Sequence, residues 1–156
     1  MTLDSKDRLI LQLLQRDVTL PVQTIAERVG LSTTPCWRRI QKLEQSGVIK
    51  QKVALLDRTL LNLGVNVFVS VKTSSHSQDW LNRFRQLIAE IPEIVEAHRM
   101  SGDVDYLLQI VTPDIATYDI IYKKLIEHLE FADISSAFAM ETLKTTTELP
   151  THYQKS

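Results

Sequence analysis

Residues 25–40 read IAERVGLSTTPCWRRI and contain a short turn between two helical segments. Gly30 follows the first segment, at the place where the left-handed backbone conformation that ends many helices favours glycine. Ser32 stands at a good N-cap position for the next helix, and Pro35 falls in the first turn of that helix. Two helices joined so closely predict a helix-turn-helix, whose second helix extends over residues 33–46.

The predicted second helix has an apolar side and a polar side. At about 100° per residue, Cys36, Ile40 and Leu43 fall on one inner face, and Trp37 lies at the boundary of that face. The opposite side carries polar and basic residues, which are Thr34, Arg38, Gln41, Lys42 and Gln45. Because the major groove of duplex DNA admits one α-helix, this side indicates contact with base edges.

DNA chemistry suggests a role for each polar side chain in this region. Arginine and lysine donate to guanine, glutamine bridges adenine, and groups at a helix N-terminus or on a flanking strand meet phosphate. Arg39, at the edge of the apolar face, suits either a phosphate or an internal partner. The candidates for reading bases are Arg38, Gln41, Lys42 and Gln45, and the candidates for phosphate contact are Ser32, Thr33, Thr34, Arg39, Lys50 and Lys52.

Charge is unevenly distributed along the 156 residues, whose net charge is only −1. Residues 1–57 carry nine Lys and Arg against six Asp and Glu, whereas residues 58–156 carry nine against thirteen. Residues 28–52 alone carry six basic side chains and one acidic side chain, an excess that suits a polyanion such as double-stranded DNA. The alternative class is a small enzyme or ligand-binding module whose N-terminal half only docks. A protein of that class does not need an excess of basic side chains. A salt titration of DNA binding distinguishes it from a DNA-binding regulator.

Helix signals precede the helix-turn-helix and a strand signal follows it. Asp4 can cap a first helix, and Pro21 stands where the helix before the turn begins. Residues 48–56 are β-prone and predict a short β-wing. The N-terminal domain is therefore predicted to be a winged helix-turn-helix over residues 1–57, followed by a linker over residues 58–64.

The second half of the chain alternates between strand and helix periodicity. The predicted strands are residues 65–73, 94–100, 106–111 and 134–143, and the predicted helices are residues 80–91 and 113–129. The order βαββαβ is the ferredoxin-like plan, so the fold class is α+β. The expected domain, residues 65–156, has a free sheet face that pairs with a second copy. Its last residues, from Thr145, are expected to form a loosely held tail.

Residues 101–105, Ser-Gly-Asp-Val-Asp, join the second and third predicted strands and admit two interpretations. In the first they form only a tight turn, whose aspartates cap backbone amides. In the second they bind a zwitterionic amino acid. Backbone N–H groups at Gly102 then take the carboxylate, and Asp103 or Asp105 takes the ammonium. Tyr106 either forms a wall of such a pocket or fills the sheet.

These motifs together resemble one known family, the Lrp/AsnC or feast/famine transcription regulators. The resemblance follows the chain in order and rests on residues 25–40, 43–44, 47–49, 54–57, 101–108 and 145–150. It implies homodimers that assemble further into octamers. It also implies that the second domain binds effector amino acids between dimers and so controls genes of amino-acid metabolism.

The same resemblance supplies the candidate effector residues. These are Gly102, Asp103, Val104, Asp105 and Tyr106 at the loop, with Ser135 and Ser136 on the last strand added by family position alone. Residues 33–37, together with the stretch from Ser136 to Met140, are similar to a subgroup that responds to cysteine and activates a cysteine desulfhydrase gene. Trp37 stands where many members of the family carry leucine.

Other chemistries find little support in the sequence. The single cysteine, Cys36, cannot form an intramolecular disulfide, and its inner position argues against a catalytic thiol. The histidines lack metal-ligand spacing, and Asp103 and Asp105 are poorly arranged to act as an acid–base pair. We therefore expect no enzymatic activity, no metal and no cofactor. Neither an apolar leader nor an apolar run of about 18 residues is seen, so we expect a cytoplasmic protein with no membrane partner.

Overall fold

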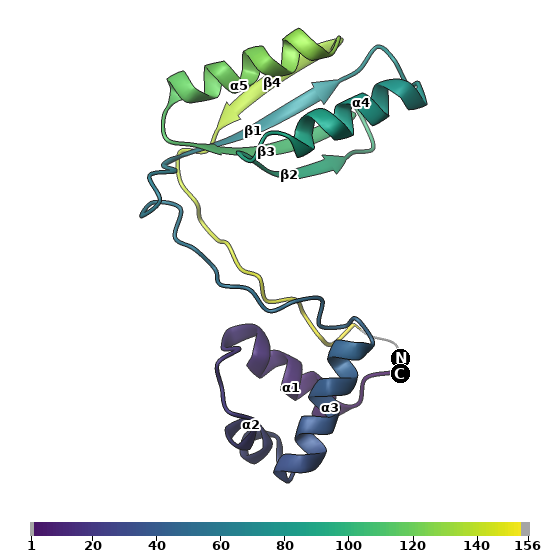
Figure 1. The fold of residues 1–156 in the computed structure, drawn as a ribbon, viewed down its shortest axis with the longest axis vertical. Helices are drawn as coiled ribbons and strands as arrows, with labels where there is room; N and C mark the ends of the chain where they lie inside the picture. The colour runs from purple at the N-terminus through teal and green to yellow at the C-terminus, as the bar shows by residue number, and fades with distance from the viewer. Residues whose placement is uncertain (1, 154–156) are drawn as a thin grey trace. The chain divides into compact units, whose positions relative to one another are not determined.

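The computed structural model describes residues 2–153, which form two compact units. The helical unit contains the residues up to Leu55 together with those from Lys144 onward, and the sheet unit contains Leu56–Leu143 (Figure 1). Each unit has a hydrophobic core of its own. No helix in the described part of the chain is long and apolar enough to cross a membrane.

Three helices form the helical unit, and they are α1 Ser5–Arg16, α2 Val22–Val29 and α3 Thr33–Gln45. The predicted cap of α1 is confirmed, because the Asp4 carboxylate accepts from the Asp7 N–H at 2.9 Å and the Asp7 carboxylate accepts from the Asp4 N–H at 3.2 Å. Gly30 ends α2 with a φ of 67°. A side chain is strained in this left-handed conformation, so Gly30 fixes the short turn that leads into α3.

The inner face of α3 is buried, as its periodicity predicted. Cys36, Ile40 and Leu43 are 0%, 5% and 1% exposed. They lie in one core with Ile10 of α1 and Ile25 of α2. Full burial of an isoleucine or leucine side chain stabilises a fold by about 1.5–3 kcal/mol. This burial therefore determines which side of α3 faces solvent.

The sheet unit consists of a four-stranded sheet and two helices. In chain order its elements are β1 Val65–Lys72, α4 Gln78–Ala89, β2 Ile94–Arg99, β3 Tyr106–Thr112, α5 Ile115–His128 and β4 Asp133–Phe138. The strands are antiparallel in the order β2-β3-β1-β4, and both helices cover one face of the sheet (Figure 1). The predicted ferredoxin-like βαββαβ fold is confirmed.

The core of the sheet unit lies between the sheet and its two helices. Every second residue of β1 from Val67 onward points toward the helices and is fully buried, and these residues are Val67, Val69 and Val71. Leu108 and Ile110 stand opposite Val69 and Val67 on β3 and are fully buried as well. The intervening residues point to the other face of the sheet, which no helix of this unit covers.

One predicted element, the β-wing, is not formed. Residues 50–57 are assigned to no strand. A strand needs a partner with which to exchange backbone hydrogen bonds, and the described residues of the helical unit contain no strand. Lys50 and Lys52 therefore lie on an irregular segment.

The last strand is shorter than predicted. β4 ends at Phe138, where residues 134–143 were expected to continue. Phe138 already stands opposite Val67, and the Ala139 N–H donates to the Asn66 carbonyl at 2.9 Å. β1 begins only at Val65, so almost no partner remains for a longer β4.

The C-terminal segment, expected to be a loose tail of a domain over residues 65–156, belongs to the helical unit instead. Gln15 of α1 makes two hydrogen bonds with Leu149. Its Nε2 donates to the Leu149 carbonyl at 3.1 Å, and its Oε1 accepts from the Leu149 N–H at 2.6 Å. The predicted linker, residues 58–64, forms a hydrogen-bonded turn within the sheet unit.

Candidate nucleic-acid interface and ligand site

The outer face of α3 is open to solvent. Thr33, Thr34, Arg38, Lys42 and Gln45 are all exposed. Among the described residues, nothing forms a hydrogen bond or ion pair with the Arg38 guanidinium or the Lys42 ammonium. A solvent-facing helix with unpaired cations and several further donors has the chemistry needed to enter a major groove.

The N-terminus of α3 also keeps free donors. Ser32 occupies the N-cap, as predicted, but its side chain makes no capping hydrogen bond. The first backbone N–H groups of a helix have no partner within the helix, and they carry the positive end of its dipole. The hydroxyl groups of Ser32, Thr33 and Thr34 thus stand beside backbone donors that suit a phosphate oxygen.

Glu44 holds two of the side chains that were predicted to contact DNA. Gln41 Nε2 donates to Glu44 Oε2 at 3.3 Å, and Lys52 Nζ lies 2.5 Å from Glu44 Oε1. Each can reach a nucleic acid either by leaving Glu44 or by using the polar groups that Glu44 does not occupy. Lys50 is exposed and makes no ion pair within the described chain, so it is the better placed of the two lysines for a phosphate contact.

Arg39 has an internal partner. Its Nη1 donates to Asp4 Oδ2 at 2.6 Å and to Asp7 Oδ1 at 2.7 Å. The hydrogen bond from the Asp7 backbone lowers the pKa of Asp4, and the hydrogen bond from Arg39 lowers it further. The two carboxylates raise the pKa of Arg39 in turn. Of the two roles left open for Arg39, the structure shows the internal one, and this guanidinium holds α3 against the start of α1.

We expect Arg39→Gln to lower the free energy of unfolding at neutral pH by about 1 kcal/mol, because two partly exposed ion pairs are lost. The pKa of Asp4 is depressed in the folded protein, so its stabilising contribution is complete above the ordinary value of 3.8 and is lost as the pH falls through the depressed value. The difference in unfolding free energy between the wild type and Arg39→Gln should therefore become smaller in strong acid. Urea unfolding followed by circular dichroism at neutral and acid pH measures it. Arg38→Gln is the control and should change neither value, whereas a gap that is equally wide in acid would contradict the assignment.

The loop between β2 and β3 contains two aspartates, of which one is hydrogen-bonded to the backbone and the other has no partner among the described residues. Asp105 Oδ2 accepts from the Thr73 N–H at 2.8 Å, and the Asp105 N–H donates to the Val71 carbonyl at 3.0 Å. Gly102 adopts a φ of 109° and is exposed. The Asp103 carboxylate is also exposed and has no hydrogen-bond or ion-pair partner among the described residues. The turn role therefore belongs to Asp105, and Asp103 is the carboxylate left for a ligand.

The other predicted effector residues do not share one surface. Tyr106 lies on the helix-covered face, where its ring centroid is 4.9 Å from that of Phe84, so it fills the core of the sheet unit. The Ser136 hydroxyl lies on the same face and forms a hydrogen bond with the Tyr118 hydroxyl. Ser135 is exposed on the opposite face, and Val104 in the loop is half-buried. Alternation along a strand explains why Ser135 and Ser136 cannot serve the same pocket.

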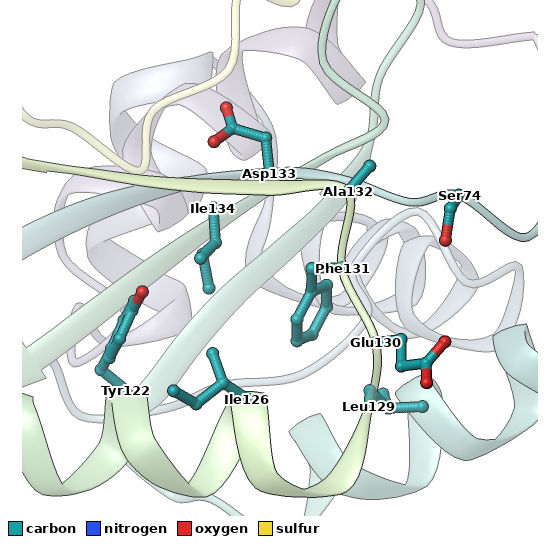
Figure 2. Close-up of a pocket in the computed structure, with 9 residues that line it drawn as sticks. All are labelled: Ser74, Tyr122, Ile126, Leu129, Glu130, Phe131, Ala132, Asp133 and Ile134. Carbon is teal, nitrogen blue, oxygen red and sulfur yellow. The ribbon is translucent and has the colours of Figure 1, made fainter.

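A cavity of about 580 Å³ lies between α5 and the start of β4, and sequence reasoning did not find it. Figure 2 shows apolar side chains converging on it from the helix, the following loop and the strand. Its lining residues are Ser74, Tyr122, Ile126, Leu129, Glu130, Phe131, Ala132, Asp133 and Ile134. No member of the predicted effector set is among them. Tyr122 and Ile126 stand one helical turn apart on α5, and only the three-dimensional structure shows that space remains in front of them.

Metal and thiol chemistry have no evident location. Within residues 2–153, no group of three or more His, Cys, Asp and Glu side chains could hold a metal ion. Cys36 is a buried free thiol, and burial raises its pKa. A raised pKa keeps the thiol neutral, which disfavours a nucleophilic role.

Comparisons with known proteins match both units to one family. Residues 3–44 match the AsnC-type helix-turn-helix domain, and residues 66–149 match the Lrp/AsnC ligand binding domain. The chain belongs to the Lrp/AsnC family. It is accordingly a DNA-binding transcriptional regulator with a ligand-binding domain.

Named relatives share this Lrp/AsnC organisation over nearly their whole length. The chain is 46% identical to the DNA-binding transcriptional activator DecR of Escherichia coli strain K12 over 149 residues, which cover 95% of this chain and 98% of DecR. It is 47% identical to the glutamate uptake regulatory protein of Zymomonas mobilis over 148 residues, covering 95% and 90% of the two chains. Both relatives are regulators, which agrees with the DNA-binding interpretation of α3.

Solved Lrp/AsnC structures have the same fold. An AsnC family transcriptional regulator from Agrobacterium tumefaciens is 60% identical and superposes with a TM-score of 0.91, covering 95% of this chain and 97% of that one. A transcriptional regulator from Neisseria meningitidis, solved in complex with L-Met, is 35% identical with a TM-score of 0.90, covering 96% and 97%. The second structure shows that a regulator of this kind can hold an amino acid.

Proposed function

We propose that a free amino acid controls this Lrp/AsnC regulator by binding at the loop between β2 and β3. The observation that carries the proposal is the exposed corner of Gly102 and Asp103, where a backbone free of side-chain cover stands next to an unpaired carboxylate. An amino acid is a zwitterion, so its site needs donors for the carboxylate and an acceptor for the ammonium. This corner offers both within two consecutive residues.

Two lines of support suggest which amino acids to test first. The Neisseria relative was solved with L-Met, and residues 33–37 are similar to the cysteine-responsive subgroup. Cysteine and methionine both carry sulfur in the side chain. We therefore propose cysteine as the first candidate effector and methionine as the second.

The proposed mode of action is assembly on DNA without catalysis. The sheet face that no helix covers would pair with a second copy, and such homodimers would assemble to octamers in the cytoplasm. Paired α3 helices would read two half-sites in successive major grooves. The effector changes DNA binding only if it has different affinities for two assemblies. No metal or cofactor is needed for these steps.

Melting-temperature shifts across the twenty amino acids identify the effector, and Asp103→Asn then tests its site. We expect the variant to bind the effector about 10- to 100-fold more weakly, because a charge-assisted hydrogen bond to the ammonium is lost. Asp119→Asn, which removes a charge from the exposed surface of α5, is the control and should bind normally. Full effector affinity in Asp103→Asn would exclude this corner, and native mass spectrometry of the same samples checks the assembly.

A further inference from the structure

Trp37 is a large apolar side chain that the core of the helical unit leaves in solvent. It is 51% exposed, whereas Trp80, the other tryptophan, is 4% exposed. Trp80 donates its indole N–H to the Glu130 carbonyl at 3.1 Å and stacks on Phe84. Trp37 has neither a hydrogen-bond acceptor nor an aromatic partner among the described residues. The stability of the helical unit therefore does not account for an indole at this position.

Trp37 lies on the flank of the same α3 surface that carries the candidate DNA contacts. Thr33 stands one helical turn before it and Gln41 one turn after it, so the three side chains follow one line along the helix. Arg38 is the next residue, and it is exposed as Thr33 and Trp37 are, whereas Gln41 is half-buried. A duplex that contacts Thr33 and Arg38 comes close to the indole, because Trp37 follows Thr33 by one helical turn and directly precedes Arg38.

The chemistry of an indole favours bases over phosphates as its partner. Its only polar group is one N–H donor, and the rest of the ring is apolar. A charged phosphate gains little from an apolar ring. In the major groove, by contrast, each thymine presents a C5-methyl group, which apolar side chains contact. Burying the exposed half of Trp37 against such methyl groups removes apolar surface from water.

We propose that Trp37 is a specificity-determining residue that contacts thymine methyl groups in the major groove. The proposal rests on DNA binding by α3 and adds that sequence preference includes an apolar term from this residue. It predicts that A·T pairs are selected where the indole lies. It also predicts that loss of the indole relaxes this preference and leaves phosphate contacts unchanged.

The first test needs no variant protein. Wild-type protein selects duplexes from a pool with a randomised centre, and sequencing identifies the preferred thymines. The best duplex is then made again with deoxyuridine at each preferred thymine, a change that removes only the methyl group. We expect binding to weaken about 5- to 20-fold at the position or positions that Trp37 contacts, within the range of a single base-pair change. Equal binding with uridine at every preferred position would overturn the proposal.

The second test links the methyl group to Trp37. Trp37→Leu and Trp37→Ala should both bind random duplexes as the wild type does, with the same dependence on salt. Trp37→Ala should be insensitive to the uridine change, and Trp37→Leu should keep part of the effect. Ile120→Ala, which truncates an apolar side chain that is 67% exposed on α5, is the matched control and should behave as wild type. If Trp37→Ala loses as much as the wild type on the uridine duplex, another residue reads the methyl group.

These outcomes separate the proposal from DNA binding itself. A protein that binds no duplex at low salt would refute DNA binding by α3, and with it the basis of the proposal. A protein that binds duplexes tightly but selects no thymine, or ignores its methyl group, would refute only the role of Trp37. Fluorescence gives a further check, because the emission of exposed Trp37 should change when DNA covers it, while buried Trp80 should report little.

Discussion

An Arg38→Ala protein is expected to bind a selected DNA site about 10- to 100-fold more weakly than the wild type, a loss of about 1–3 kcal/mol. Arg38 is exposed on α3 and has no partner among the described residues. It therefore breaks no intramolecular hydrogen bond or ion pair when it enters the groove. A guanidinium can donate two parallel hydrogen bonds to guanine O6 and N7, which makes arginine the commonest reader of guanine. Affinity for random duplexes should fall far less, because no specific base is lost there.

Two controls distinguish base reading from general attraction. Lys50→Ala should weaken binding to selected and random duplexes alike and should reduce the salt slope by about one. Arg85→Ala removes the same charge from an exposed position on α4 and should leave DNA binding unchanged. Fluorescence anisotropy over a range of salt concentrations measures all four proteins. Equal losses for Arg38→Ala and Lys50→Ala on both kinds of duplex would reject the placement of α3 in the groove.

A Phe84→Ala protein is expected to lose about 3–5 kcal/mol of unfolding free energy from the sheet unit, the usual range for truncating a buried phenylalanine. Phe84 is 1% exposed, and its ring centroid lies 5.0 Å from that of Trp80 and 4.9 Å from that of Tyr106. Truncation leaves a cavity between α4 and the sheet and removes the ring contacts with Trp80, Tyr106 and Phe131. Few single changes to this unit should cost more.

Urea unfolding followed by tryptophan fluorescence measures this loss, because Trp80 is buried in the sheet unit and becomes exposed on unfolding, whereas Trp37 is already half exposed in the folded protein. Ile120→Ala serves here as well, and it should change the unfolding free energy by at most about 0.5 kcal/mol since the side chain is largely exposed. A loss below about 1 kcal/mol for Phe84→Ala would mean that this cluster does not stabilise the unit.

Local signals explain why so much of the fold could be predicted. Helix caps and periodicity act over a few residues, so Asp4, Gly30 and the inner face of α3 were readable without any tertiary information. The βαββαβ order could also be predicted from local signals, because the hydrophobic periodicity of each strand and helix lies within its own residues. The strand order then follows from a known plan.

Features that depend on distant residues were harder to predict. Arg39 finds Asp4 and Asp7 across more than thirty residues of sequence, and nothing near Arg39 reveals those partners. The prediction of a β-wing was wrong for a related reason. β propensity is a property of one segment, whereas a strand also needs a second segment with which to pair. The C-terminal end of β4 was likewise set by where β1 begins.

The candidate ligand site likewise has features that local sequence predicts and features that depend on the tertiary structure. The loop chemistry at Gly102 and Asp103 is local, and the structure leaves both residues exposed. Which side of the sheet Tyr106 and Ser136 occupy depends on register, because a shift of one residue moves a side chain to the other face. The cavity beside α5 depends on how a helix, a loop and a strand fit together, so no single stretch of sequence could reveal it.

The attachment of the C-terminal segment to α1 means that the sheet unit is inserted into the sequence of the helical unit. Besides the bonds of Gln15, Arg16 forms an ion pair with Glu148 at 3.1 Å. The backbone therefore joins the two units twice. After a single protease cut within residues 50–57, the three helices would remain attached to the sheet unit only through the non-covalent contacts between α1 and the C-terminal segment. Exchange of the sensor for another during evolution would require two simultaneous junctions, one near Leu55 and one near Lys144, so a simple end-to-end fusion would not preserve this architecture.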